Sequence, residues 1–192
     1  MTSLPLSSLQ AYLQMMVEFR SSQRSQLTVE GFVLRHGRIF SSEVLTPSEL
    51  KIVQAAYKLA SRRCFFEQRE CWWNAKALVK ADRTKTLRYV EGYGRHLIPT
   101  LHAWAEINGK VVDMTWRVSH LEEGSFENWN VGRFSTDFEY HGVVFSSDEL
   151  AQWTPKDKSS LLDNWKNQWK LIRSDFRLTP ISEEVQDVCS TL

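Results

Sequence analysis

The sequence predicts an α+β fold, with an antiparallel sheet of about four to five strands packed against a helix that begins at a cysteine. Two observations predict this class. Apolar residues recur with helical spacing in the first 80 residues and again after residue 147, whereas they alternate with polar residues between residues 87 and 145. A block of strands between two blocks of helices is typical of an α+β protein with an antiparallel sheet.

The bulk composition predicts a single domain over residues 1–192. The formal net charge of +1 favours neither nucleic acid nor a membrane surface as a partner, and no apolar run approaches the roughly 20 residues of a membrane span. The N-terminus lacks the basic and apolar regions of a signal peptide. Three cysteines, an odd number, are typical of free thiols in a reducing compartment, so we expect a cytoplasmic protein.

Residues 1–63 are expected to form N-terminal helices. Ser7 or Ser8 caps the first, which runs to about Arg24 and has an apolar stripe made of Leu9, Tyr12, Leu13, Met16 and Val17. The next helix begins at a capping box, in which Thr46 is followed by Pro47 in the first turn and by Glu49 three residues later. Between them, the sequence GFVLR is compatible with a short strand.

The central region, residues 64–146, combines a short helix with the strands. Helical spacing places Cys71, Asn74, Ala75, Leu78 and Val79 on one side of a helix that begins near Cys71. After the polar break KADRTKT, the stretches LRYVEGY, TLHAWAEI and KVVDMTWRV read as strands, and FSTDFEYHGVVF reads as a fourth that Gly142 interrupts.

Residues 147–180 are expected to return to helices, followed by a tail over residues 181–192. SSDEL caps a short helix, and residues 156–173 read as one long helix. Its stripe consists of Leu161, Leu162, Trp165, Trp169 and Ile172, and is either core or a docking surface for a partner.

The stretch LHAWAEINGKVVDMTW carries the strongest functional signal. Asn108-Gly109 between two alternating runs predicts a type I′ hairpin turn, which pairs Ile107 with Lys110, Trp104 with Asp113 and His102 with Thr115. This register places His102, Trp104, Glu106, Val111, Asp113 and Thr115 on one face, where His102 and Asp113 are diagonal neighbours. A carboxylate on one ring nitrogen leaves the other free to act as a base, whereas the alternative is a half-exposed polar face.

Cys71 supplies a nucleophile for this base. A thiol at the start of a helix gains from the helix dipole, and a neighbouring imidazolium favours its thiolate form. A helix-opening cysteine followed by a histidine and an aspartate on adjacent strands is the arrangement expected of an acyl-transfer site, so Cys71, His102 and Asp113 are the predicted catalytic residues.

The motifs ECWWNA, YVEGY and LHAWAEINGKVVDMTW, taken together and in this order, resemble the transglutaminase-like branch of the papain-type cysteine enzymes. The resemblance covers about Cys71 to Trp116 and implies a transglutaminase-like core over residues 64–146. More narrowly, the combination resembles small transglutaminase-like proteins of bacteria and bacteriophages, which implies the host cytoplasm if the protein is phage-encoded. The bulky Trp72 and Trp73 depart from the small residue that often follows the family's cysteine.

Other residues are candidates for support. The backbone N–H of Cys71 and the side-chain amide of Gln68 are candidate oxyanion donors, the latter with a surface glutamine as the alternative. Asn74, one turn after Cys71, either orients a side chain of the site or has the structural role that we favour. Trp72, Trp104 and Glu91 are candidates for the walls of the cleft. The alternative for Trp104 is a packing role in the core, and the alternative for Glu91 is a position facing water.

The remaining cysteines fit the nucleophile role less well. Cys64 follows a helix end without an apolar stripe after it and is expected to be a buried structural thiol, and Cys189 lies in the tail. A zinc site built from Cys71, His102 and Asp113, with His120 or His141, lacks a close-spaced pair of ligands, so no metal or cofactor is expected.

The leading hypothesis is a cysteine-dependent acyl-transfer enzyme that acts through a thioester on a carboxamide or peptide-like substrate, as a protease, amidase, deamidase or transglutaminase. One alternative is an idle module of the same fold that binds a host or partner protein. A weaker one is an acyl carrier similar to the arylamine N-acetyltransferases, which also use Cys, His and Asp in this order.

Overall fold

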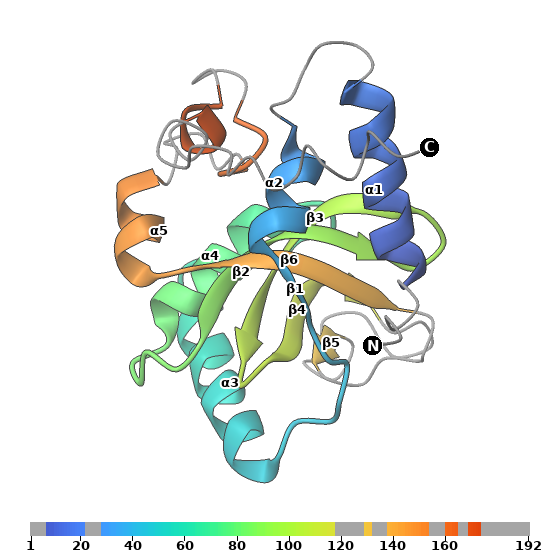
Figure 1. The fold of residues 1–192 in the computed structure, drawn as a ribbon. Helices are drawn as coiled ribbons and strands as arrows, with labels where there is room; N and C mark the ends of the chain where they lie inside the picture. Colours follow the sequence, from blue (N-terminus) through green and yellow to red (C-terminus); the bar gives the residue numbers. More distant parts are fainter. Residues whose placement is uncertain are drawn as a thin grey trace.

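The computed structural model describes residues 7–21, 28–117, 129–131, 138–153, 160–164 and 169–173, and these confirm the predicted α+β class (Figure 1). The helices are α1 (Ser8–Ser21), α2 (Val29–His36), α3 (Pro47–Ala60), α4 (Cys71–Ala81) and α5 (Ser147–Trp153). The strands are β1 (Arg38–Ile39), β2 (Arg88–Arg95), β3 (Pro99–Ile107), β4 (Lys110–Arg117), β5 (Trp129–Val131) and β6 (Glu139–Phe145).

The strands form one antiparallel sheet in the order β1-β6-β2-β3-β4-β5. The sheet has six strands, one more than the upper limit predicted, because β1 and β5 have only two and three residues. Strands this short offer too few positions for alternation to be recognised. Gly142 does not interrupt the fourth predicted strand, since it pairs with both Arg38 and Gly92 inside β6.

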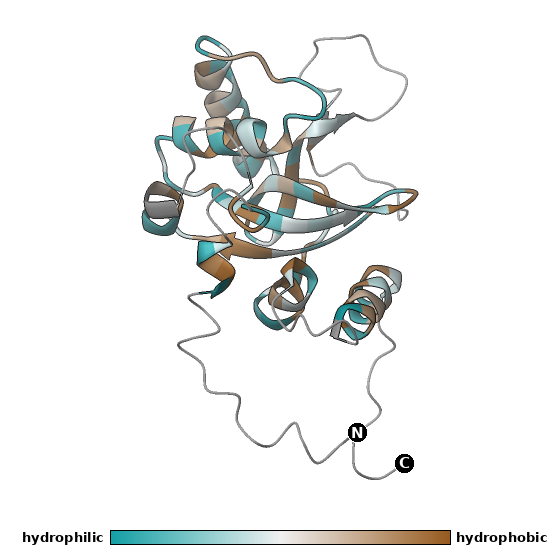
Figure 2. Cartoon of the chain, turned by 90° about the horizontal axis from the view of Figure 1, so that it is seen from above, coloured by the Kyte–Doolittle hydropathy of each residue, from teal (hydrophilic) through white to brown (hydrophobic). Residues whose placement is uncertain are grey.

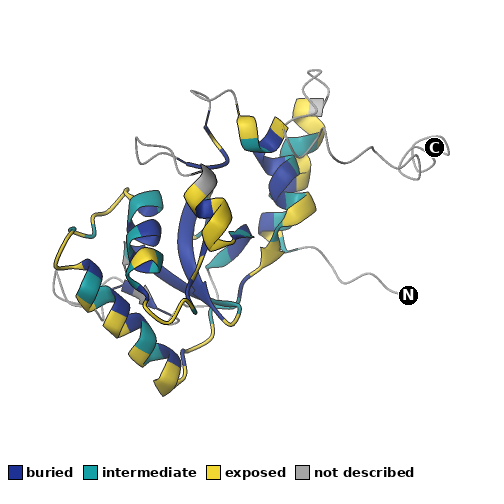
Figure 3. Cartoon of the chain, turned by 90° about the vertical axis from the view of Figure 1, so that its left-hand side faces the viewer, coloured by how far each residue is buried: buried dark blue, intermediate teal, exposed yellow. Residues whose placement is uncertain are grey.

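The helices cover the face of the sheet to which Tyr89, Ala103 and Val143 point. One buried cluster joins these three residues to side chains of α1, α2 and α4. Figure 3 shows the central strands in the dark blue of buried residues, while the flanking helices turn exposed sides outward. The other face carries a smaller aromatic cluster: Phe40, Val90, Trp104, Val111 and Tyr140, with Trp116, Phe138 and Val144 packed against it.

Two predicted helix starts are confirmed by the contacts that stabilise them. At α3, the Thr46 hydroxyl accepts from the backbone N–H of Glu49, and the Glu49 carboxylate accepts from the backbone N–H of Thr46, which completes the capping box. Helix α4 begins at Cys71 and buries Cys71, Asn74, Ala75 and Leu78. On α1, Leu9 and Leu13 are buried and the rest of the predicted stripe is half-buried; residues 22–24 lie outside the described residues.

The short strand predicted at GFVLR is wrong, because these residues belong to α2. The Thr28 hydroxyl caps this helix by accepting from the backbone N–H of Gly31. Val29, Phe32 and Val33 then fall on its buried side. This helical spacing covers too few residues to be recognised in the sequence beside Phe32 and Val33, which favour strands.

The single long helix predicted over residues 156–173 is also wrong. Residues 161–163 are bends, residues 160 and 164 have no regular structure, and residues 170–173 are helical. Leu161, Leu162 and Ile172 are buried as core residues, whereas Trp169 is exposed and Trp165 lies outside the described residues. The tertiary contacts of residues 160–164, given below, override their helical pattern.

Candidate active site

The turn between β3 and β4 has the predicted form. Asn108 and Gly109 both have positive φ, 52° and 83°, as a type I′ turn requires. Ile107 pairs with Lys110, as the register predicted.

The ladder between β3 and β4 ends much earlier than predicted. Only three pairs form, the last being Ala105 with Val112, so the expected pairs of Trp104 with Asp113 and of His102 with Thr115 are absent from it. Farther along, the pairing of β4 with β5 shifts register between Asp113 and Arg117. The two strands therefore part where His102 and Asp113 lie.

His102 and Asp113 nonetheless form the expected hydrogen bond. The Nε2–H of His102 donates to Oδ2 of Asp113 over 2.7 Å, and both side chains are buried. Asp113 also accepts from the Tyr140 hydroxyl at Oδ2 (3.0 Å) and from the backbone N–H groups of Thr115 (2.8 Å) and Trp116 (3.3 Å) at Oδ1. Four donors therefore fix the carboxylate and, through it, the imidazole.

Cys71 completes the group. Burial lowers the pKa of His102, but the charge and hydrogen bond of Asp113 raise it and the nearby Cys71 side chain raises it further, to about 10. Since Nε2 is bonded to Asp113, Nδ1 is the ring nitrogen left for the thiol. The structure thus brings the three predicted catalytic residues together, with His102 bonded to Asp113 and Cys71 beside His102.

These residues come from opposite faces of the sheet. Cys71 belongs to the cluster on the helix-covered face, whereas His102 alternates with Ala103 of that cluster and so points to the other face. The parting of β3 and β4 provides the place where the start of α4 meets His102. Sequence reasoning assumed a continuous ladder and missed this feature.

Asn74 holds the start of α4 against β4. Its Nδ2 donates to the carbonyl oxygens of Glu67 (2.7 Å) and Met114 (3.1 Å) and to the hydroxyl of Thr115 (3.0 Å), and its Oδ1 accepts from the backbone N–H of Glu67 at 3.3 Å. The side chain is fully buried. Asn74 therefore has the structural role that the sequence favoured, joining the Cys71 helix to the strand of Asp113.

Two residues of the site escaped the sequence reasoning. The Trp116 ring stacks on the His102 imidazole, with centroids 4.2 Å apart and planes 9° apart, and Tyr140 donates to Asp113 from β6. Alternation along LHAWAEINGKVVDMTW gave no sign of either contact, because Trp116 follows the register shift and Tyr140 is 27 residues from Asp113.

Glu91 neither faces water nor lines an open cleft. It is fully buried, and its carboxylate accepts from the Ser160 and Tyr89 hydroxyls and from the backbone N–H groups of Leu161 and Leu162. Burial raises its pKa to about 7, although these N–H donors, the charge of Lys76 and the Tyr89 hydroxyl act in the opposite direction.

The other candidates for support differ in their positions. Trp104 is fully buried between Phe40 and Tyr140, so it packs the core and does not wall a cleft. Trp72 is half-buried against the cluster that contains Cys71. Gln68 is exposed and makes no hydrogen bond within the described part of the chain, so its side chain is not held toward the site.

Cys64 is only half-buried, not buried as predicted, because it lies just after α3, where its thiol donates to the carbonyl of Ala60. Cys189 and His120 lie outside the described residues. His141 is buried in β6, and burial lowers its pKa.

Among the residues with a described position, no group of three or more His, Cys, Asp or Glu side chains is arranged to hold a metal ion. None of the described helices is long and apolar enough to cross a membrane. The chain matches no family model, no curated protein and no solved structure.

Proposed function

We propose that this protein is a cysteine-dependent acyl-transfer enzyme with Cys71 as nucleophile, His102 as general base and acid, and Asp113 as the group that orients His102. The observation that carries the proposal is the buried His102–Asp113 pair, with its carboxylate held by four donors, beside a Cys71 side chain close enough to raise the pKa of His102. A histidine that only stabilises the fold needs no thiol beside it, whereas His102 lies next to the Cys71 thiol and bonds to a buried carboxylate.

The geometry supports a two-step reaction. With the thiol proton held at Nδ1 of His102, Cys71 Sγ forms a bond to the carbonyl carbon of the substrate as its C=O π bond breaks, and the carbonyl oxygen takes up the negative charge. The intermediate collapses to a thioester as the leaving amine or ammonia departs with the proton from His102. Water or an amine then attacks the thioester, with His102 again removing a proton, and Cys71 is released.

The negative oxygen requires hydrogen-bond donors near Cys71. The backbone N–H of Cys71 lies in the first turn of α4, where N–H groups have no acceptor within the helix. The same end of the helix is positive because the peptide dipoles align, so it stabilises both a thiolate and an oxyanion. This donor belongs to the backbone, so a second donor from the exposed Gln68 side chain is not required to stabilise the oxyanion.

Alkylation of the two described cysteines tests the proposal. At pH 6, an ordinary thiol is thiolate in only about 0.3% of molecules, so a thiol held as an ion pair with imidazolium reacts up to about 300-fold faster per site. We expect His102→Ala to slow the reaction of Cys71 with iodoacetamide at this pH by about 100-fold, because the burial of the thiol affects both proteins equally and only its activation differs. The half-buried Cys64 is a control within the same molecule, and its rate should not change.

The same labelling separates the second candidate function, a binding module in which the triad is idle. Leu97 and Ile98 favour it, because both are strongly exposed at the tip of the β2–β3 hairpin, which is brown in Figure 2. Such a module requires no activated thiol. If the rate of Cys71 alkylation at pH 6 is the same with and without His102, the enzyme proposal fails, and the binding module is the candidate left to test.

A further inference from the structure

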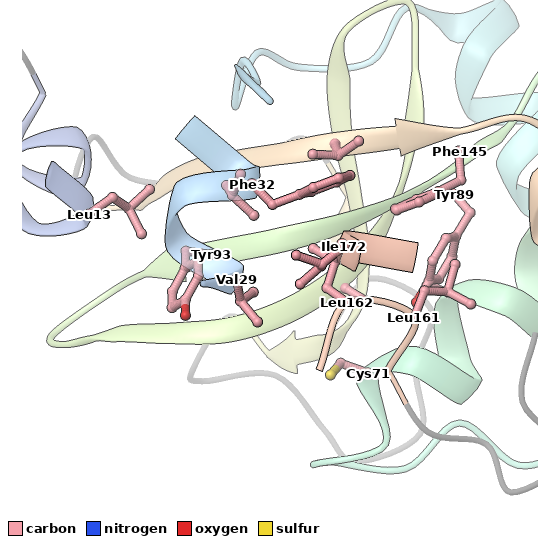
Figure 4. Packing of buried hydrophobic residues seen from close by; sticks show 14 of the residues in the cluster. Leu13, Val29, Phe32, Cys71, Tyr89, Tyr93, Phe145, Leu161, Leu162 and Ile172 are labelled. Carbon is pink, nitrogen blue, oxygen red and sulfur yellow. The ribbon is translucent and has the colours of Figure 1, made fainter. Parts of the chain in front are cut away.

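Residues Ser160–Asn164 form a short non-helical segment, here called the strap, that packs on the candidate active site. Leu161 and Leu162 are buried in the same cluster as Cys71. Figure 4 shows both leucines beside Cys71, with Ile172 next to them. The strap is about 90 residues from Cys71 in the sequence, so only the tertiary fold places it there.

The strap is attached to the sheet through one side chain. Glu91 accepts from the Ser160 hydroxyl, from the backbone N–H of Leu161 at 2.9 Å and from that of Leu162 at 3.1 Å. The Ser160 oxygen also accepts from the backbone N–H of Asp163 at 2.7 Å, which fixes the bend of the strap. Two polar contacts of Ser160 thus link the shape of the strap to its attachment.

The attachment point belongs to the rigid part of the fold. Glu91 lies in the middle of β2, paired with Ala103 on one side and Val143 on the other. The strap contributes no strand to the sheet and no described helix, and it is hydrogen-bonded to the sheet at Glu91.

The burial of Cys71 is a further observation that bears on the role of the strap. Cys71 is only 5% exposed, although it is the first residue of a helix that would otherwise open toward solvent. An acyl substrate has to reach Sγ, so a thiol buried in the same cluster as Leu161 and Leu162 has to become exposed first.

We propose that the strap is a displaceable cover, fastened to Glu91 by Ser160, Leu161 and Leu162, and that it must open before a substrate reaches Cys71. The opening is a local motion of the strap, and the sheet and α4 keep their positions. The part of this inference that concerns a substrate rests on the proposed function. The part that concerns access to the thiol does not.

The Ser160→Ala variant tests the fastening. It removes one donor to a buried carboxylate and the acceptor for Asp163, so we expect the open form to be populated about 10- to 100-fold more. Hydrogen exchange at the amides of Leu161 and Leu162, and alkylation of Cys71 by a bulky maleimide, should both accelerate by that factor. Ser146→Ala is the matched control, because Ser146 caps the neighbouring helix α5 by accepting from the N–H of Glu149; it should change neither rate.

Two results would overturn the proposal. Unchanged rates in Ser160→Ala would mean that the strap is a fixed part of the core. Equal acceleration at the amides of Ala103 and Ala105 in β3 would mean that the whole domain opens. The measurement is repeated with His102→Ala: the effect of Ser160→Ala on access should persist there, so failure of the enzyme proposal removes only the dependence on His102.

Discussion

Replacing Asn74 by alanine should remove the hydrogen bonds that attach the Cys71 helix to the strand of Asp113 and so destabilise the fold. The asparagine is fully buried and makes four hydrogen bonds at 2.7 to 3.3 Å, to Glu67, Met114 and Thr115. Alanine keeps the helix propensity and removes all four bonds. It also leaves the Met114 carbonyl and the Thr115 hydroxyl without this donor in a buried setting.

The expected cost follows from these contacts. A hydrogen bond contributes about 1 kcal/mol net, and a buried group left without a partner costs about 1–3 kcal/mol. Since the two N–H groups of Asn74 serve three acceptors, the bonds are not fully additive, and we expect a loss of about 2–4 kcal/mol in the free energy of unfolding. For a chain of this length, that corresponds to a decrease in Tm of roughly 5–15 °C.

Thermal and urea denaturation of the purified protein, followed by circular dichroism, measure this loss. Gln54→Ala, which removes an amide from the exposed side of α3, is the matched control and should stay within about 0.5 kcal/mol of the wild type. The Asn74→Ala variant should also alkylate Cys71 more slowly at pH 6. A change in Tm of less than 2 °C, with rapid labelling retained, would refute the assignment of Asn74 as the joint.

Three further outcomes are expected. Tyr140→Phe removes one donor from the Asp113 carboxylate, and urea denaturation should show a loss of about 1.5–3 kcal/mol; an unchanged midpoint would contradict the contact. Gly142→Ala places a Cβ 2.6 Å from the Trp104 ring, and the free energy of unfolding should decrease by about 1–3 kcal/mol in the same assay. An unchanged midpoint would show that the ring shifts without cost. The raised pKa of Glu91 means that the folded state binds the Glu91 proton more tightly than the unfolded state does. The stability that this difference contributes is therefore complete below pH 4.5 and is lost as the pH rises to about 7. That contribution is up to about 3 kcal/mol, and Glu91→Gln should flatten this part of the pH–stability curve; an unaltered slope would show that another group titrates.

Local chemistry made much of the fold predictable. Asn108-Gly109 fixes a turn because both positions need positive φ, and the pair Ile107–Lys110 follows from it. The capping box at Thr46 depends on residues within one helical turn. In each case, neighbours in the sequence make the contacts that decide the structure, so the pattern carries the information.

The sequence failed where distant segments compete with local preference. Residues 160–164 have the apolar spacing of a helix, yet their backbone N–H groups bond to Glu91 and not along a helix. GFVLR has β-branched and aromatic residues, yet the Thr28 cap and the burial of α2 on the sheet make it helical. Tertiary hydrogen bonds and burial outweigh propensities that differ by less than about 1 kcal/mol per residue.

The candidate site divides in the same way. The sequence by itself determined the order of Cys71, His102 and Asp113 and the shared face of the last two, because turn geometry and strand alternation are local. Only the tertiary structure decided that β3 and β4 part beside them, that Tyr140 and Trp116 contact the pair, and that Leu161 and Leu162 join the buried cluster of Cys71. Those features depend on packing between segments 14 to about 90 residues apart, and the free energy of burial that selects them has no signature in any short stretch of sequence.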